Sequence, residues 1–140
     1  MNKIILEIVT PEDIVYSDEV DMVTVPSVVG TLGILPRHVP LFAQLIEGEL
    51  KIKKQDQEYL LSIGGGFIEV TKTKVIILVT RAVHASQLNE KEILQARQNA
   101  IEALKRQPKG EESIMAQVLL RQSLVDLRLM RKMKKRHRAN

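Results

Sequence analysis

The side chains best suited to chemistry in this sequence are three histidines and a cluster of acidic residues. His38, His84 and His137 lie far apart and lack the helical spacing of a zinc site. The acidic cluster at 18–21 lacks the glycine and the twelve-residue span of a calcium loop, so a solvated strand edge is the better interpretation. We therefore expect no metal site and no metal cofactor.

Phosphate and thiol chemistry also have few candidate residues. The triplet at 64–66 is three glycines, but no Lys-Ser or Lys-Thr follows it, and a strand pattern comes next in place of a helix start. A glycine bend between two strands is the simpler interpretation. The chain has no cysteine, which excludes disulfides, thiolate metal sites and a cysteine nucleophile. The sequence therefore offers almost no candidate catalytic residues.

Cations gather at one end of the chain. Residues 107–140 hold 9 Lys and Arg against 3 Asp and Glu, a net of +6, whereas residues 1–106 hold 12 against 14, a net of −2. Within the basic end, four cations follow one another at spacings of seven, three and four, which places them on one edge of a helix. They are Arg121, Arg128, Arg131 and Lys135.

The basic end fits several partners. RNA, an acidic protein or an anionic lipid surface would each attract the charge, and the cations would also complement the dipole of the helix that carries them. All four aromatic residues precede residue 86, so no stacking platform for bases accompanies the cations: Tyr16, Phe42, Tyr59 and Phe67. We therefore expect no nucleic-acid partner.

Residues before about 86 have the pattern of strands. Residues 49–53 alternate strictly between polar and apolar, and a polar turn at 54–57 leads into an apolar run at 59–63, which predicts a β-hairpin. The run at 75–79 is β-branched and apolar on both faces, as in a central strand. Many short runs separated by proline and glycine predict a compact sandwich or barrel.

After this region the period becomes helical. Asn89 is a suitable N-cap, residues 107–110 interrupt the pattern, and a second helix is predicted from 113 to 136. The sequence thus predicts an α+β protein, with a β-sandwich domain at 1–86 and an antiparallel two-helix hairpin at 87–140. Two such helices bury too little apolar surface to be stable alone, so the hairpin needs the β domain or a partner to pack against.

Membrane insertion and export are not expected. The longest uncharged stretch, residues 22–36, contains proline and glycine and is shorter than the roughly 20 apolar residues of a membrane helix. Glu7 interrupts the first apolar run too early for a signal peptide. We expect a soluble protein.

Residues 30–41 read Gly-Thr-Leu-Gly-Ile-Leu-Pro-Arg-His-Val-Pro-Leu. They closely resemble the epsilon subunit of F-type ATP synthase, whose pattern there is Gly-x-x-Gly-Ile-Leu-Pro-x-His-x-Pro-Leu. The resemblance continues through 48–52 and 65–70 and covers the whole chain. It implies a ten-stranded β-sandwich followed by a helical hairpin, in a noncatalytic rotor subunit of the central stalk. It also implies a peripheral position at the cytoplasmic face of the inner (plasma) membrane.

The resemblance further implies the partners. They are the gamma subunit, the c subunits of the membrane rotor ring, and the catalytic beta subunits when the hairpin is extended. Thr31, Arg37 and His38 become candidate contacts to the ring, presented by a loop that Pro36 and Pro40 make rigid, although a merely structural turn is the alternative. The candidate inhibitory contacts, which would restrain ATP hydrolysis, are Arg121, Arg128, Arg131 and Lys135. The alternative function is a free-standing basic module that binds RNA or an acidic protein.

Two departures from the family pattern bear on nucleotides and on the linker. Some bacterial members bind ATP through an acid and an arginine at the start of the first helix. Here Asn89 replaces the acid and Glu92 replaces the arginine, so a cation that would face phosphate has become an anion. We therefore expect no nucleotide binding. Thr80 and Arg81 also stand where the family commonly has Ala-Asp.

Overall fold

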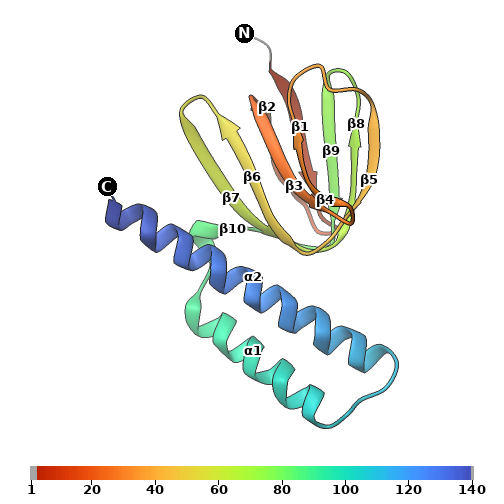
Figure 1. Ribbon diagram of the computed structural model, residues 1–140, viewed down its shortest axis with the longest axis vertical. Coiled ribbons are helices and arrows are strands. Elements are labelled where there is room, and N and C mark those ends of the chain that lie inside the picture. Colours follow the sequence, from red (N-terminus) through yellow and green to blue (C-terminus); the bar gives the residue numbers. More distant parts are fainter. Residues whose placement is uncertain (1–2, 140) are drawn as a thin grey trace. The chain divides into compact units, whose positions relative to one another are not determined.

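The computed structural model describes residues 3–139, with side chains for residues 3–136. Ten strands come first, then one short 3-10 helix and two long α-helices (Figure 1), which confirms the predicted α+β class. The chain divides into two compact units, one ending at His84 and the other beginning at Ala85. The predicted boundary lies two residues further on, and residues 1, 2 and 140 of the predicted ranges lie outside the description.

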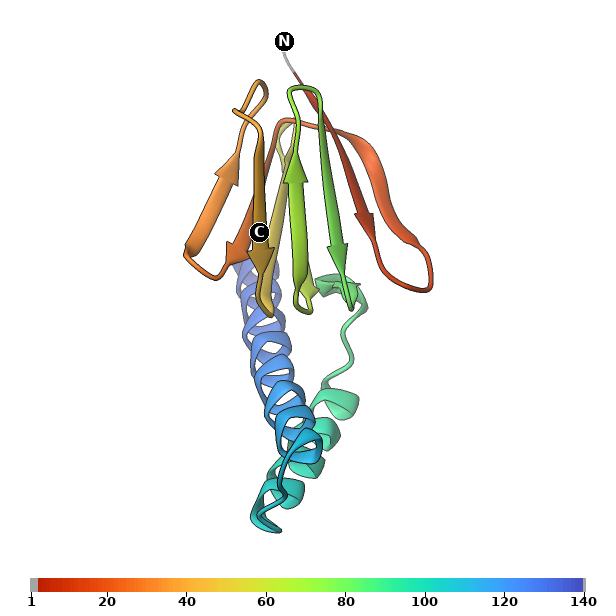
Figure 2. The same ribbon diagram turned by 90° about the vertical axis from the view of Figure 1, so that its right-hand side faces the viewer.

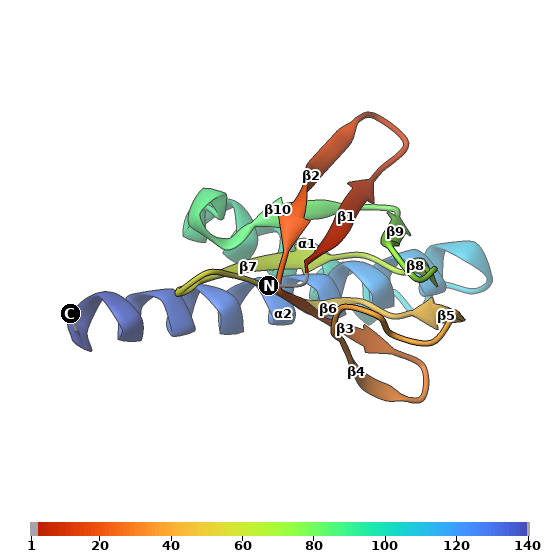
Figure 3. The same cartoon turned by 90° about the horizontal axis from the view of Figure 1, so that it is seen from above.

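The first unit is a single sheet that folds back on itself. In strand order it runs β10-β7-β6-β3-β5-β8-β9-β1-β2, with β4 paired to β3. The pairing of β1 with β9 is parallel. Figure 2 shows β8 and β9 in green between the other strands, and in Figure 3 the β1–β2 and β3–β4 hairpins project from opposite sides of the unit. The strands are β1 (Ile4–Val9), β2 (Ile14–Val20), β3 (Met22–Ser27), β4 (Gly30–Ile34), β5 (Leu41–Leu45), β6 (Gly48–Lys54), β7 (Gln57–Ile63), β8 (Gly66–Val70), β9 (Lys74–Val79) and β10 (Ala82–His84).

Alternating apolar residues form the core of this unit. In β1, for example, Leu6 and Ile8 are fully buried while their neighbours in the strand are partly exposed. The predicted hairpin is present as β6 and β7, joined by a turn in which Gln55 has a φ of 57°. The predicted central run is β9, which lies between β8 and β1. The sequence pattern therefore identified these strands and their turn.

The glycine triplet is explained by close packing of the backbone. Gly66 begins β8, and a Cβ atom there would lie 1.9 Å from the carbonyl oxygen of Leu78. At Gly64 a Cβ would lie 2.3 Å from Thr80 Oγ1, whereas at Gly65 the nearest atom, Leu45 O, is at 3.5 Å. Gly66 therefore leaves no room for a Cβ against the backbone, whereas at Gly64 the Thr80 side chain would have to move; both agree with a glycine bend between strands.

The second unit contains η1 (Ala85–Gln87), α1 (Glu90–Lys105) and α2 (Glu111–Ala139). Asn89 caps α1, as predicted, because its side-chain oxygen accepts the Glu92 N–H at 3.1 Å. At the same end of the helix pair, Lys134 of α2 forms an ion pair with Glu90, the first residue of α1, at 3.2 Å. Among the described residues, no helix is long and apolar enough to cross a membrane.

Candidate interaction sites

The predicted ring contacts lie on β4 and on the loop that follows it. Thr31 is exposed on β4, where it pairs with Pro26 of β3. Arg37 is also exposed and has a φ of 64°, a left-handed conformation that is uncommon for a residue with a side chain. His38 is half-buried. Its backbone N–H donates to the backbone oxygen of Leu35 at 3.2 Å, and this hydrogen bond closes the turn that contains Arg37. The loop therefore presents Arg37 from a hydrogen-bonded turn.

The predicted inhibitory contacts all lie on α2. Each of the four side chains is exposed, in agreement with a shared edge: Arg121, Arg128, Arg131 and Lys135. Leu124 lies on the same edge and is 49% exposed, so the cations flank one apolar side chain. We call this set of five residues the cation edge. In the same basic end of the chain, the side chains of His137 and Arg138 lie outside the described residues.

A third surface was not predicted from the sequence. Phe42 of β5, Phe67 of β8 and Leu78 of β9 are 66%, 45% and 51% exposed, and all three lie on the outer face of neighbouring strands. The two phenylalanine rings stack with centroids 5.4 Å apart, and Phe67 lies directly opposite Leu78 in the strand register. We call these three residues the aromatic patch.

The aromatic patch adjoins a shallow groove of about 430 Å³. Thr10 and Pro11 line one side of it, beyond the end of β1, and Gly65 and Gly66 line another. Soluble monomers rarely expose contiguous apolar surface without a use for it, and larger patches mark protein interaction sites. The patch and its groove therefore form a candidate docking surface on the first unit.

One sequence signal pointed to this patch. The run at 75–79 is apolar on both faces, which predicts a central strand, and β9 is central in the sheet; only one of its faces is fully buried, however, and Ile76 and Leu78 point outward. An apolar residue on the outward face of a strand is therefore the signal that was available. Phe42 and Phe67 could be placed beside it only with the register of β5, β8 and β9.

The acidic residues at 18–21 join two distant strands. Asp18 of β2 pairs with Lys54 at the end of β6, and Asp21 accepts the Gln55 N–H at 2.7 Å. The hydrogen bond from Lys54 lowers the pKa of Asp18, and the same bond raises the pKa of Lys54. Burial, followed by the nearby Asp18 charge, raises the pKa of Tyr16. Asp18 and Glu19 are exposed, as a solvated strand edge predicts, and Asp18 and Asp21 contact the end of β6 and the turn that follows it.

Two further ligands considered from the sequence are a metal ion and a nucleotide. No group of three or more His, Asp or Glu side chains within residues 3–136 is arranged to hold a metal ion. At the start of α1, Asn89 uses its side-chain oxygen to cap the helix, and Glu92 is exposed. The lack of nucleotide binding stays a prediction.

Comparison with known proteins identifies a family and several relatives of this chain. The family described as "ATP synthase, Delta/Epsilon chain, beta-sandwich domain" matches residues 3–85. The ATP synthase epsilon chain of Herpetosiphon aurantiacus is 43% identical over 124 residues, covering 89% of this chain and 91% of that one. That of Dehalococcoides mccartyi (strain CBDB1) is 35% identical over 136 residues, covering 96% and 97%.

Solved structures share the fold. A chain of the Euglena gracilis mitochondrial ATP synthase, in a structure of OSCP, F1 and the c-ring, has a TM-score of 0.74 at 22% identity and is matched over 86% of this chain and 76% of that one. A chain from the Tetrahymena thermophila central stalk and c-ring has a TM-score of 0.58 at 15% identity, with 92% and 97% covered. Because the sequence matches span the β-sandwich and nearly the full length of the relatives, the chain belongs to the ATP synthase epsilon-chain family.

Proposed function

We propose that this chain is a noncatalytic rotor subunit of an F-type ATP synthase. In this proposal it couples the gamma subunit to the membrane rotor ring in the central stalk, at the cytoplasmic face of the plasma membrane, and its hairpin restrains ATP hydrolysis. Family membership supports the assembly, and the source of the structural neighbours, F1 with a c-ring and a central stalk, supports the location. The observation that carries the proposal is the aromatic patch.

The aromatic patch is the surface that we assign to gamma. A rotor subunit transmits torque only if its contact with the shaft is tight and rigid, and stacked aromatic side chains on a sheet supply large apolar area with few rotamers to fix. Phe42 and Phe67 already stack on each other before any partner arrives. Binding therefore costs little side-chain entropy at this surface.

The loop after β4 is the surface that we assign to the ring. Polar loops of the c subunits need hydrogen-bonding and charged partners, which Thr31, Arg37 and His38 supply. The hydrogen-bonded turn holds Arg37 outward, so its guanidinium is available for bidentate contacts with a carboxylate or with carbonyl oxygens.

The cation edge is the surface that we assign to the catalytic beta subunits. Each exposed ion pair contributes only about 0.2–1 kcal/mol, so inhibition must come from several pairs acting together and must weaken as salt is added. The hairpin would extend to reach the head, which requires the Glu90–Lys134 pair to open. That pair is exposed, so its loss costs little.

Recovery of gamma with variants of the full chain tests the gamma assignment. We expect the double variant Phe42→Ser, Phe67→Ser to bind gamma about 100- to 1,000-fold more weakly, because two buried aromatic anchors at an interface contribute about 2 kcal/mol each and are not fully additive. The matched control is Ile14→Ser, which removes an equally exposed apolar residue from β2. Equal gamma binding by both variants would reject the assignment, and recovery with nucleic acid alone would favour a free-standing basic module.

A further inference from the structure

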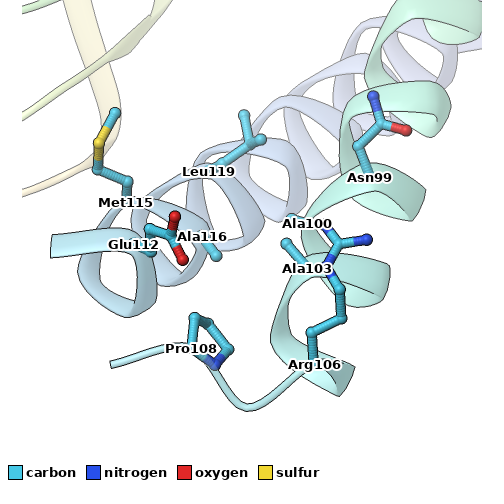
Figure 4. Close-up of a pocket in the computed structure, with 9 residues that line it drawn as sticks. All are labelled: Asn99, Ala100, Ala103, Arg106, Pro108, Glu112, Met115, Ala116 and Leu119. Atoms are coloured by element: carbon cyan, nitrogen blue, oxygen red, sulfur yellow. The ribbon is translucent and has the colours of Figure 1, made fainter. Parts of the chain in front are cut away.

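Two features of the molecule are not used by the proposed function. One is a groove of about 570 Å³ at the joined end of α1 and α2 (Figure 4), whose rim carries exposed charges of both signs, Arg106 and Glu112. These charges favour no one class of partner. The other is the outer backbone edge of β4, which, in the part of the chain that the structure describes, pairs with β3 alone. A free strand edge is a template for another strand, so it defines its complement more closely.

The edge of β4 lacks the usual protection against pairing. Natural sheets protect their edges with charged residues, proline or very short strands. The edge strand β2 carries Asp18 and Glu19, and β10 has only 3 residues. In contrast, β4 reads Gly-Thr-Leu-Gly-Ile and lies within the uncharged stretch at 22–36. A second strand can therefore approach β4 without meeting a charge.

The backbone groups that point away from β3 are those of Thr31 and Gly33. Pro26, which lies opposite Thr31, has no N–H, and its carbonyl oxygen accepts from the Ile46 N–H at 3.1 Å. Because hydrogen-bonded and non-hydrogen-bonded pairs alternate along an antiparallel ladder, the residues on either side of Thr31 bond to β3. The N–H and C=O groups of Thr31 and Gly33 are left facing outward.

These outward groups are complementary to themselves. Thr31 and Gly33 lie on either side of Leu32, so two copies of β4 that meet antiparallel about Leu32 place Thr31 of one copy opposite Gly33 of the other. Each such pair exchanges both of its N–H···O bonds, and the twofold axis repeats the pair. The same register places Val29, which is 81% exposed, opposite Leu35, which is 55% exposed. One register therefore satisfies the free backbone groups and covers both exposed side chains.

We propose that the unassembled chain pairs with a second copy of itself through β4, antiparallel and centred on Leu32. The pairing uses neither the aromatic patch nor the cation edge, and it goes beyond the proposed function. Since Thr31 also belongs to the surface assigned to the ring, pairing and ring contact exclude each other. The dimer is therefore a form of the free chain.

Single cysteines in the full chain test the register, because the natural sequence contains no cysteine. Leu32→Cys lies on the axis, at a non-hydrogen-bonded pair whose Cα atoms are about 4.5 Å apart, within the range of a disulfide. We expect mild oxidation to link this variant to itself. The matched control is Val29→Cys, which is more exposed than Leu32 but whose two copies the register holds about 20 Å apart. A mixture of Val29→Cys with Leu35→Cys should link across the two copies.

Sedimentation of the cysteine-free chain measures the dimer itself, and we expect a monomer–dimer equilibrium. Thr31→Pro removes an outward N–H and leaves the β3 ladder intact, so it should weaken the dimer about tenfold or more, since the axis makes each dimer lose that bond twice. Thr31→Ala keeps the N–H and should dimerise like the wild type. Circular dichroism checks that both variants fold, and if Thr31→Pro does not, the cysteine pairs decide alone.

Three results overturn the proposal. They are a chain that stays monomeric at every concentration, self-linking of Val29→Cys as readily as of Leu32→Cys, and equal dimerisation of the folded Thr31→Pro and Thr31→Ala variants.

Discussion

The aromatic patch and the cation edge differ in their chemistry and in the elements that carry them. The patch is apolar and is carried by three neighbouring strands whose other face is core, so its side chains are held in place before binding. The cation edge is charged and lies on one helix of a hairpin in which many polar side chains are exposed. The first arrangement favours a lasting contact, and the second favours one that forms and breaks as salt or conformation changes.

The largest expected effect concerns the rigidity beneath the aromatic patch. In the variant Gly66→Ala, the added methyl group meets the Leu78 carbonyl, so β8 and β9 must separate beneath two patch residues. We expect the free energy of unfolding of the full chain to fall by about 3 kcal/mol, measured by urea denaturation. Gly65→Ala is the control, since its Cβ meets only an ordinary contact. Equal losses in the two variants would show that packing at β8 is not what holds the patch.

A smaller effect is expected at the start of the hairpin. Asn89→Ala removes the acceptor that caps the Glu92 N–H, which should cost about 1 kcal/mol of local stability. Hydrogen exchange of the first-turn amides of α1 measures this loss directly. Asn89→Asp keeps the acceptor and should retain the protection. If the alanine variant exchanges as slowly as the wild type, the cap contributes nothing to the hairpin.

A pH-dependent effect is expected where β2 meets β6. Because the Lys54 hydrogen bond lowers the pKa of Asp18 below 3.8, the stability from Asp18 is present at neutral pH and is lost as pH falls through the folded-state pKa. The pKa of Lys54 is raised above 10.5, so its stability is lost only as pH rises through that higher value. The difference in Tm between wild type and Asp18→Asn should therefore vanish in strong acid.

The control for this experiment is Glu12→Gln, which removes an exposed carboxylate from the β1–β2 turn. Its Tm should follow that of the wild type across the whole range. A Tm difference for Asp18→Asn that is constant with pH would contradict the link between this pair and stability.

The smallest effect is expected when the hairpin is removed altogether. A chain ending at Ala85 should keep a β-type circular dichroism spectrum and a cooperative melt, because its apolar core consists of residues of the strands. A disordered spectrum, or melting without cooperativity, would show that the strands that carry the patch need the hairpin in order to fold. The two regions would then not be independent.

Much of the fold could be predicted because its signals are local. The alternation in 49–53, the turn after it and the cap at Asn89 each specify an element within a few residues. The aromatic patch could not be predicted in the same way, since Phe42 and Phe67 meet only through the pairing of β5 with β8. The Asp18–Lys54 pair joins residues 36 positions apart for the same reason.

The surfaces also differ in how far the sequence could define them. Helical spacing alone grouped the four cations, because residues on one helix keep fixed angles whatever their surroundings.

The central claim is that a lasting apolar contact and a reversible charged contact reside in different regions. ATP hydrolysis by the reconstituted catalytic head, with gamma recovery measured in the same samples, tests it most directly.

The test variant replaces the four cations by alanine: Arg121, Arg128, Arg131 and Lys135. The control removes the same charge from exposed positions elsewhere: Lys53, Lys72, Lys105 and Lys109. We predict that the test variant binds gamma normally and releases hydrolysis at low salt, while the control still inhibits. Equal inhibition by wild type, test variant and control would contradict the account.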